Sequence, residues 1–112
     1  MATEFTDIFV IPLADGTLQY FAIDSNDFIS TRWKKTPDPN SGWTELTEFQ
    51  MPLDVPKDGF SPGVIPSAKK ICGAQLPDGR VQLFAIDGAG DTWTCWKTGV
   101  ASSSDWSPWK RF

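Results

Sequence analysis

The sequence has no histidine among its 112 residues. A catalytic triad built on histidine and a zinc site of the usual cysteine–histidine type are therefore not expected. Two cysteines, Cys72 and Cys95, are too few for a disulfide framework, so we expect a reduced or buried pair. No apolar run approaches the roughly 18 residues of a membrane span, and we expect no membrane insertion.

Basic charge is also scarce. The formal net charge is −4 and the isoelectric point is near 4.6, which argues against a phosphate-binding surface and against nucleic acid as a partner. The opening residues MATEFTDIFV lack a basic segment followed by a long apolar stretch. This pattern predicts no secretory signal, and hence a cytoplasmic or non-classically released protein.

Signatures of catalysis are missing as well. A glycosidase needs two carboxylates facing each other across the scissile bond, and no acidic pair here stands out by an apolar setting. A glycine-rich phosphate loop and the motif G-x-S-x-G are both absent. We therefore predict a protein that is not an enzyme and carries no cofactor or metal.

Aromatic residues, in contrast, are abundant, with six tryptophans, eight phenylalanines and one tyrosine. They belong to an internal repeat. Residues 13–34, LADGTLQYFAIDSNDFISTRWK, align without a gap on residues 76–97, LPDGRVQLFAIDGAGDTWTCWK, 63 positions later. The same offset places Trp43 on Trp106 and Phe49 on Phe112. The chain is thus two copies of one unit, and such repetition fixes the architecture.

Each copy predicts four short strands joined by turns, and no stretch has sustained helical periodicity. The Asp-Gly pairs at 15–16 and 78–79 are strong hairpin signals. The strand at 17–24 is apolar on both faces, which indicates that both are covered. The strands are expected at 6–13, 17–24, 28–35, 43–49, 70–76, 80–87, 91–98 and 106–112. The predicted units are a first blade (1–50), a Pro/Gly-rich connector (51–68) and a second blade (69–112).

A repeated four-stranded meander with periodic tryptophans is typical of a β-propeller blade. One blade cannot bury both of its faces, and closed propellers have about four to eight blades. We therefore expect an all-β chain of two blades whose ring is completed by identical chains, with three chains and six blades as the preferred count. The alternative is a piece of a longer propeller.

The second copy, LPDGRVQLFAIDGAGDTWTCWKT followed by DWSPWKRF, resembles the blades of tectonin-like propeller lectins, in particular the fucose-binding Photorhabdus type. The resemblance covers both copies, about four-fifths of the chain. It implies glycan partners such as fucosylated or methylated sugars. The first copy departs from the pattern, with Ser30 in place of Trp93 and Leu46 in place of Trp109.

Tryptophan rings bind sugars by stacking on pyranose C–H groups, with polar side chains serving the hydroxyls. We consider the pairs Trp33 with Trp43 and Trp96 with Trp106, which flank the long loop of each copy. The alternative is that these rings fill the space between blades, because tryptophan buries a large area. For Asp87 we favour capping of a turn. The candidate carbohydrate-binding residues are Trp33, Trp43, Trp93, Trp96, Trp106, Trp109, Arg80 and Asp87.

We therefore predict a non-catalytic, multivalent carbohydrate-binding lectin. A protein-interaction or structural propeller module is the alternative, since one fold hosts many functions. A fragment of a larger propeller protein, enzyme or toxin is a third interpretation.

Overall fold

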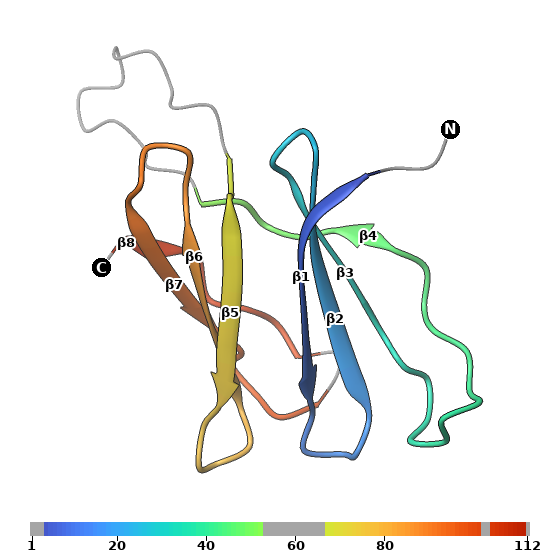
Figure 1. Ribbon diagram of the computed structural model, residues 1–112. Helices are drawn as coiled ribbons and strands as arrows, with labels where there is room; N and C mark the ends of the chain where they lie inside the picture. Colours follow the sequence, from blue (N-terminus) through green and yellow to red (C-terminus); the bar gives the residue numbers. More distant parts are fainter. Residues whose placement is uncertain (1–3, 53–66, 102–103, 112) are drawn as a thin grey trace.

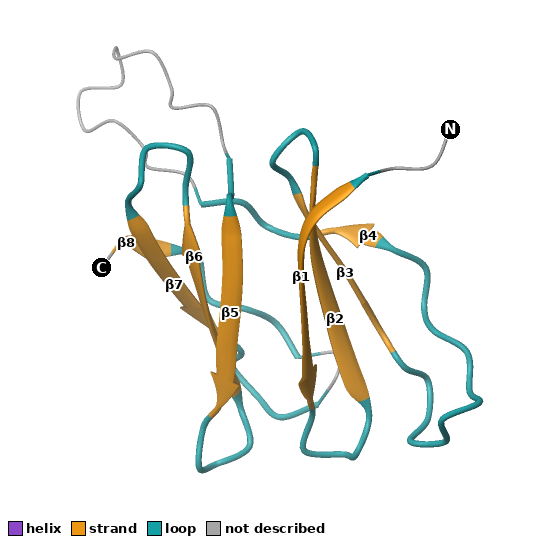
Figure 2. Ribbon diagram, in the orientation of Figure 1, coloured by secondary structure: helices purple, strands orange, loops and turns teal. Residues whose placement is uncertain are grey.

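The computed structural model describes residues 4–52, 67–101 and 104–111. These residues form two four-stranded antiparallel sheets and no helix (Figures 1 and 2). The first sheet contains β1 (Phe5–Pro12), β2 (Leu18–Asp24), β3 (Ile29–Trp33) and β4 (Thr47–Glu48). The second contains β5 (Lys70–Gln75), β6 (Val81–Ile86), β7 (Thr92–Trp96) and β8 (Lys110–Arg111). The strand order follows the chain in both sheets, so the all-β prediction with one meander per copy is confirmed.

The two Asp-Gly pairs form the first hairpin of each sheet. Gly16 and Gly79 have φ angles of 87° and 92°, in the left-handed region that glycine tolerates best. The carboxylates of Asp15 and Asp78 each accept the backbone NH two residues further on, at 2.9 and 3.1 Å. Each Asp-Gly pair therefore specifies its turn through both residues.

A glutamine repeats in the same way, buried in the first sheet and half-buried in the second. Gln19 donates through Nε2 to Oγ1 of Thr31 at 3.0 Å, and Gln82 donates to Thr94 at 2.9 Å. Each bond joins the second strand of a sheet to the third. The two sheets thus share this side-chain hydrogen bond as well as their strand order.

The fourth strands are shorter than the predicted ranges 43–49 and 106–112, and residue 112 lies outside the described residues. The hydroxyl of Thr44 accepts the backbone NH of the last residue of β3 at 3.0 Å, and the hydroxyl of Ser107 does the same for β7. A side-chain oxygen thereby replaces a backbone acceptor and interrupts the ladder. Only isolated bridges and two-residue strands remain.

β1 and β5 lie side by side at the centre and run in the same direction, while β4 and β8 lie at the outer edges (Figure 1). Side chains alternate between the faces of a strand, so each sheet has two faces. We call inner the two faces that contact each other. The inner face of the first sheet carries Phe9, Ile11, Phe21, Ile23, Ile29 and Phe49, and that of the second carries Ile71, Leu83, Ala85, Trp93, Cys95 and Trp109.

Aromatic rings join the two inner faces. Phe21 is fully buried, and its ring stacks on Phe9 at 6.4 Å. It also meets the edges of Phe49 and Trp106 at 5.3 and 5.9 Å. Edge-to-face pairs at these distances add to the free energy gained by burial.

Polar contacts fix the alignment of the sheets. The backbone NH of Ile71 in β5 donates to the carboxylate of Asp7 in β1 at 3.0 Å. The indole NH of Trp109 donates to the carbonyl of Gln50 at 2.8 Å. Because both bonds join the first copy to the second, the chain forms one packed unit of two sheets.

Most of the predicted connector, residues 53–66, lies outside the described residues. The unit boundaries at 1–50, 51–68 and 69–112 stay a prediction. Two antiparallel sheets are consistent with two blades, but they do not close a ring.

Replacing Phe21 by alanine should lower the free energy of unfolding by about 3–5 kcal/mol, because it removes a buried aromatic ring and leaves a cavity. Urea denaturation followed by tryptophan fluorescence measures the change. As a control, Phe28→Ala removes an exposed ring and should alter stability by less than about 0.5 kcal/mol. Equal losses in both variants would contradict the assignment of Phe21 to the core.

Candidate functional site

The eight predicted site residues differ in burial. Trp93 is 3% exposed, and Trp109 and Asp87 are buried as well. The remaining residues, Trp33, Trp43, Trp96, Trp106 and Arg80, are half-buried. Stacking on a ligand needs an accessible ring face, so the half-buried tryptophans are the better candidates.

Asp87 caps the turn between β6 and β7. One carboxylate oxygen accepts the backbone NH groups of Ala89 and Asp91 at 2.8 and 3.0 Å, and the other accepts the indole NH of Trp93 at 2.8 Å. Burial alone would raise the pKa of Asp87, but these bonds and the nearby charge of Arg111 outweigh it and lower the pKa. Asp87 and Trp93 thus form one structural unit.

The tryptophans found in the second copy alone have a structural explanation. Trp93 and Trp109 lie on the inner face of the second sheet, against the first sheet. Their counterparts Ser30 and Leu46 stand on the outer face of the first sheet, which the described part of the chain leaves uncovered. The extra rings fill the one interface between the sheets.

The structure does not bring the predicted tryptophan pairs together on one face. Trp33 lies opposite Gln19 in the ladder, whereas Trp43 bridges to Lys34. Adjacent positions 33 and 34 point to opposite faces, so the two rings are separated by the sheet. Trp96 and Trp106 are separated in the same way, with Trp106 on the inner face.

Trp43 instead belongs to a cluster on the outer face of the first sheet that sequence reasoning missed. Its ring meets Tyr20 edge-on at 6.2 Å. The guanidinium of Arg32 lies 5.0 Å from the Tyr20 ring and 5.6 Å from Trp43, and Lys34 Nζ lies 5.7 Å from Trp43. These are cation–π distances. The sequence does contain one signal for Lys34, because the repeat places a lysine, Lys97, at the equivalent position of the second copy.

Lys34 also holds the loop that precedes Trp43. Its ammonium donates to the carbonyl of Asp38 at 2.6 Å and to the hydroxyl of Ser41 at 2.9 Å. The side chain is buried although it is charged. The aromatic cluster therefore rests on a loop fixed by an internal cation.

Lys97 is the counterpart in the second sheet and is almost completely buried. Its ammonium lies 5.5 Å from the Trp106 ring and donates to the carbonyl of Ala101 at 3.2 Å. Burial lowers the pKa of Lys97 to about 8, and the charge of Asp15 opposes part of that shift. Asp15 belongs to the first sheet, so this attraction acts between the sheets.

The other polar candidate, Arg80, is half-buried and lies near the surface. Arg80 pairs with Asp78 through Nε at 2.7 Å, next to the second hairpin. The bonds from the backbone NH and side chain of Arg80 lower the pKa of Asp78. Exposed pairs of this kind contribute little to stability. Arg80 is distant in sequence and topology from the cluster around Trp43.

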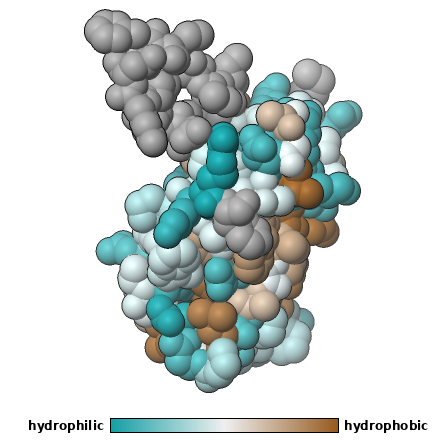
Figure 3. Space-filling model, turned by 90° about the vertical axis from the view of Figure 1, so that its left-hand side faces the viewer, coloured by the Kyte–Doolittle hydropathy of each residue, from teal (hydrophilic) through white to brown (hydrophobic). Residues whose placement is uncertain are grey.

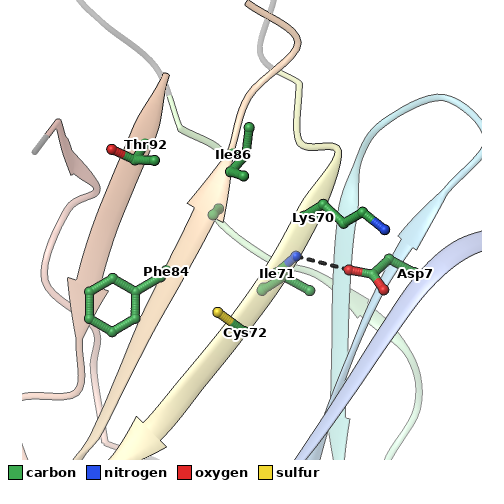
Figure 4. A pocket seen from close by; sticks show the side chains of 8 residues that line it. Asp7, Lys70, Ile71, Cys72, Phe84, Ile86 and Thr92 are labelled. Atoms are coloured by element: carbon green, nitrogen blue, oxygen red, sulfur yellow. Dashed lines mark hydrogen bonds between the residues drawn. The ribbon is translucent and has the colours of Figure 1, made fainter. Parts of the chain in front are cut away.

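The structure also contains a pocket of about 670 Å³ on the outer face of the second sheet (Figure 4). It is lined by Asp7, Lys70, Ile71, Cys72, Phe84, Ala85, Ile86 and Thr92. None of the predicted site residues is among them. The lining is mainly apolar, with Asp7 and Lys70 on the side of β1, and it differs in kind from a polar sugar site.

The two cysteines lie in different environments. Cys72 is exposed at this pocket, whereas Cys95 is buried, and burial raises the pKa of the Cys95 thiol to about 12. Neither forms a disulfide. We expected a reduced or buried pair, and the structure has two free thiols, of which one is buried and one is accessible.

Comparison with known proteins adds no assignment. No protein-family model matches the chain, and a search of curated proteins finds no match either. Among the described residues, no helix has the length and apolar character required to cross a membrane. The resemblance to tectonin-like lectins remains a prediction.

Replacing Asp87 by asparagine should cost about 1–3 kcal/mol at neutral pH, because the indole and backbone donors lose a charged acceptor. The pKa of Asp87 is lowered from 3.8. Its contribution is therefore complete above that value and is lost as the pH falls through the lower, folded-state pKa. Urea titrations of the wild type and the variant should converge as the pH falls through that lowered pKa.

Asp24→Asn is the matched control. The carboxylate of Asp24 accepts the backbone NH groups of Asn26 and Phe28 at 2.8 and 3.1 Å, but in an exposed turn. Asp24→Asn should therefore lose less free energy of unfolding than Asp87→Asn. A stability difference between wild type and Asp87→Asn that does not change with pH would refute the role of the carboxylate charge.

Proposed function

We propose that this protein is a non-catalytic carbohydrate-binding lectin of the β-propeller type, in which identical chains complete the ring. The preferred assembly is a homotrimer of six blades. The ligand class is a glycan that carries fucose or a related, methylated sugar. No nucleic acid or membrane takes part.

The observation that carries the proposal is the half-buried ring of Trp43 beside Arg32 and Lys34. A sugar needs an aromatic surface for its C–H groups and donors for its hydroxyls. An indole beside a guanidinium offers both. Tyr20 extends the aromatic surface.

The repeat supplies two related sites in the proposed ring. Within one chain, Trp33 lies on the inner face of the first sheet and Trp106 on that of the second. Between chains, Trp96 on the outer face of a second sheet has the same relation to Trp43 of the next copy. Both sites are thus at junctions between neighbouring blades, and each ring offers several.

Binding at such shallow sites is expected to be weak for one site and strong for the ring. Linked sites raise the effective concentration for the second binding event, so avidity grows without new contacts. Multivalent glycans on a surface are the natural partners of this arrangement.

A protein-interaction module is the second candidate. It is favoured by the apolar residues on the outer face of the first sheet, where Ile8, Val10 and Leu46 are exposed. Contiguous apolar patches of this kind mark protein contacts.

A glycan array tests the proposal. The wild type should bind fucosylated or methylated glycans, and Trp96→Ala should lose at least tenfold in apparent affinity, since it removes one stacking surface from every chain. Phe28→Ala, which removes an exposed ring outside the proposed sites, should bind as the wild type. Circular dichroism verifies that each variant is folded.

A wild-type protein that binds no glycan on the array would refute the lectin proposal and favour the interaction module. If Trp96→Ala unfolds, Trp96 is a structural residue instead.

A further inference from the structure

Equivalent positions of the two copies differ sharply in exposure. Ile23 on the inner face of the first sheet is 0% exposed, but its counterpart Ile86 is 39% exposed. Ile71 on the inner face of the second sheet is 5% exposed, while its counterpart Ile8 is 57% exposed. Each sheet therefore has one face covered by the other copy and one apolar face left at the surface.

The pocket lies on the face of the second sheet that is equivalent to the inner face of the first sheet. In the first sheet this face is covered, and in the second it is at the surface. On the first sheet, Phe9 and Phe21 receive the inner face of the second sheet. Their counterparts on the second sheet, Cys72 and Phe84, line the pocket together with Ile86 (Figure 4). Figure 3 views the molecule from the side of the second sheet and shows brown, hydrophobic residues at the surface among hydrophilic ones.

We propose that the pocket on the outer face of the second sheet binds the outer face of the first sheet of a second copy of this chain. The two chains would then repeat the relation that the sheets have within one chain. The contact is head-to-tail, because two different faces meet. It provides the ring assumed in the proposed function, but its evidence is independent of any sugar.

Charge supports the choice of a second copy. Within the chain, Asp15 in the hairpin of the first sheet attracts Lys97 in the second. The repeat places Asp78 in the hairpin of the second sheet and Lys34 in the first. Docking of a second copy in the same relation brings Asp78 of one chain toward Lys34 of the other, so opposite charges meet again.

Docking also accounts for the pattern of the second strand. β2 is apolar on both faces, with Phe21 and Ile23 on one and Leu18, Tyr20 and Ala22 on the other. The second sheet covers the face of Phe21 and Ile23. A second copy covers the other face. A head-to-tail contact gives a ring when its rotation closes, and in such a ring every chain has both faces covered by a neighbouring sheet.

Two single substitutions test the contact. Ile8→Asp places a charge on the first sheet's outer face, and Ile86→Asp places one on the second sheet's outer face. Each variant alone should sediment as a single chain of 12.4 kDa. An equimolar mixture should form a dimer of two chains, about 25 kDa, because one intact pair of faces remains. Val100→Asp, an exposed loop position, should assemble as the wild type.

The exposed thiol gives a second readout. Cys72 should react with a thiol reagent at least tenfold more slowly in the assembled wild type than in Ile8→Asp, because the docked copy covers the pocket. Residue 8 belongs to the first sheet and Cys72 to the second, so the change would report on docking. Cys95 is buried and should stay unreactive in both.

A wild type that sediments as a single chain overturns the proposal, whether Cys72 reacts or not. So does a mixture of the two variants that remains monomeric. An assembled protein without glycan binding keeps this contact and refutes only the lectin. A monomeric protein that binds glycans refutes this contact and keeps the lectin proposal.

Discussion

The burial of the Phe21 ring between the two sheets is the contact on which the rest of the structure depends. Phe9, Phe49 and Trp106 surround that ring, and they come from both copies of the repeat. A four-stranded sheet with two apolar faces is unstable alone in water, and our proposal therefore gives each sheet a neighbour on either side. Within one chain, each sheet has one such neighbour.

Equivalent faces of the two sheets differ in their side chains and in what covers them. The inner face of the second sheet carries the large rings Trp93 and Trp109, while the equivalent face of the first carries Ser30 and Leu46. The permanent interface within the chain is accordingly more aromatic than the outer faces. Four tryptophans remain half-buried, and they are the ones assigned to ligands in our proposal: Trp33, Trp43, Trp96 and Trp106.

Local signals predicted most of the fold. The Asp-Gly hairpin at 15–16 and the carboxylate cap of Asp87 follow from chemistry within a few residues, and both could be read from the sequence. The interruption caused by Thr44 could not, since a hydroxyl that replaces a backbone acceptor leaves no periodic trace. The site was less predictable. Whether Trp43 meets Trp33 or Arg32 depends on the register between strands.

The central claim is that the chain's two open faces are complementary to each other. Native mass spectrometry of the wild-type protein tests it most directly. The account predicts a closed assembly of several chains, preferably three chains of 12.4 kDa with a total near 37 kDa. A folded protein with the mass of one chain at micromolar concentration would contradict it.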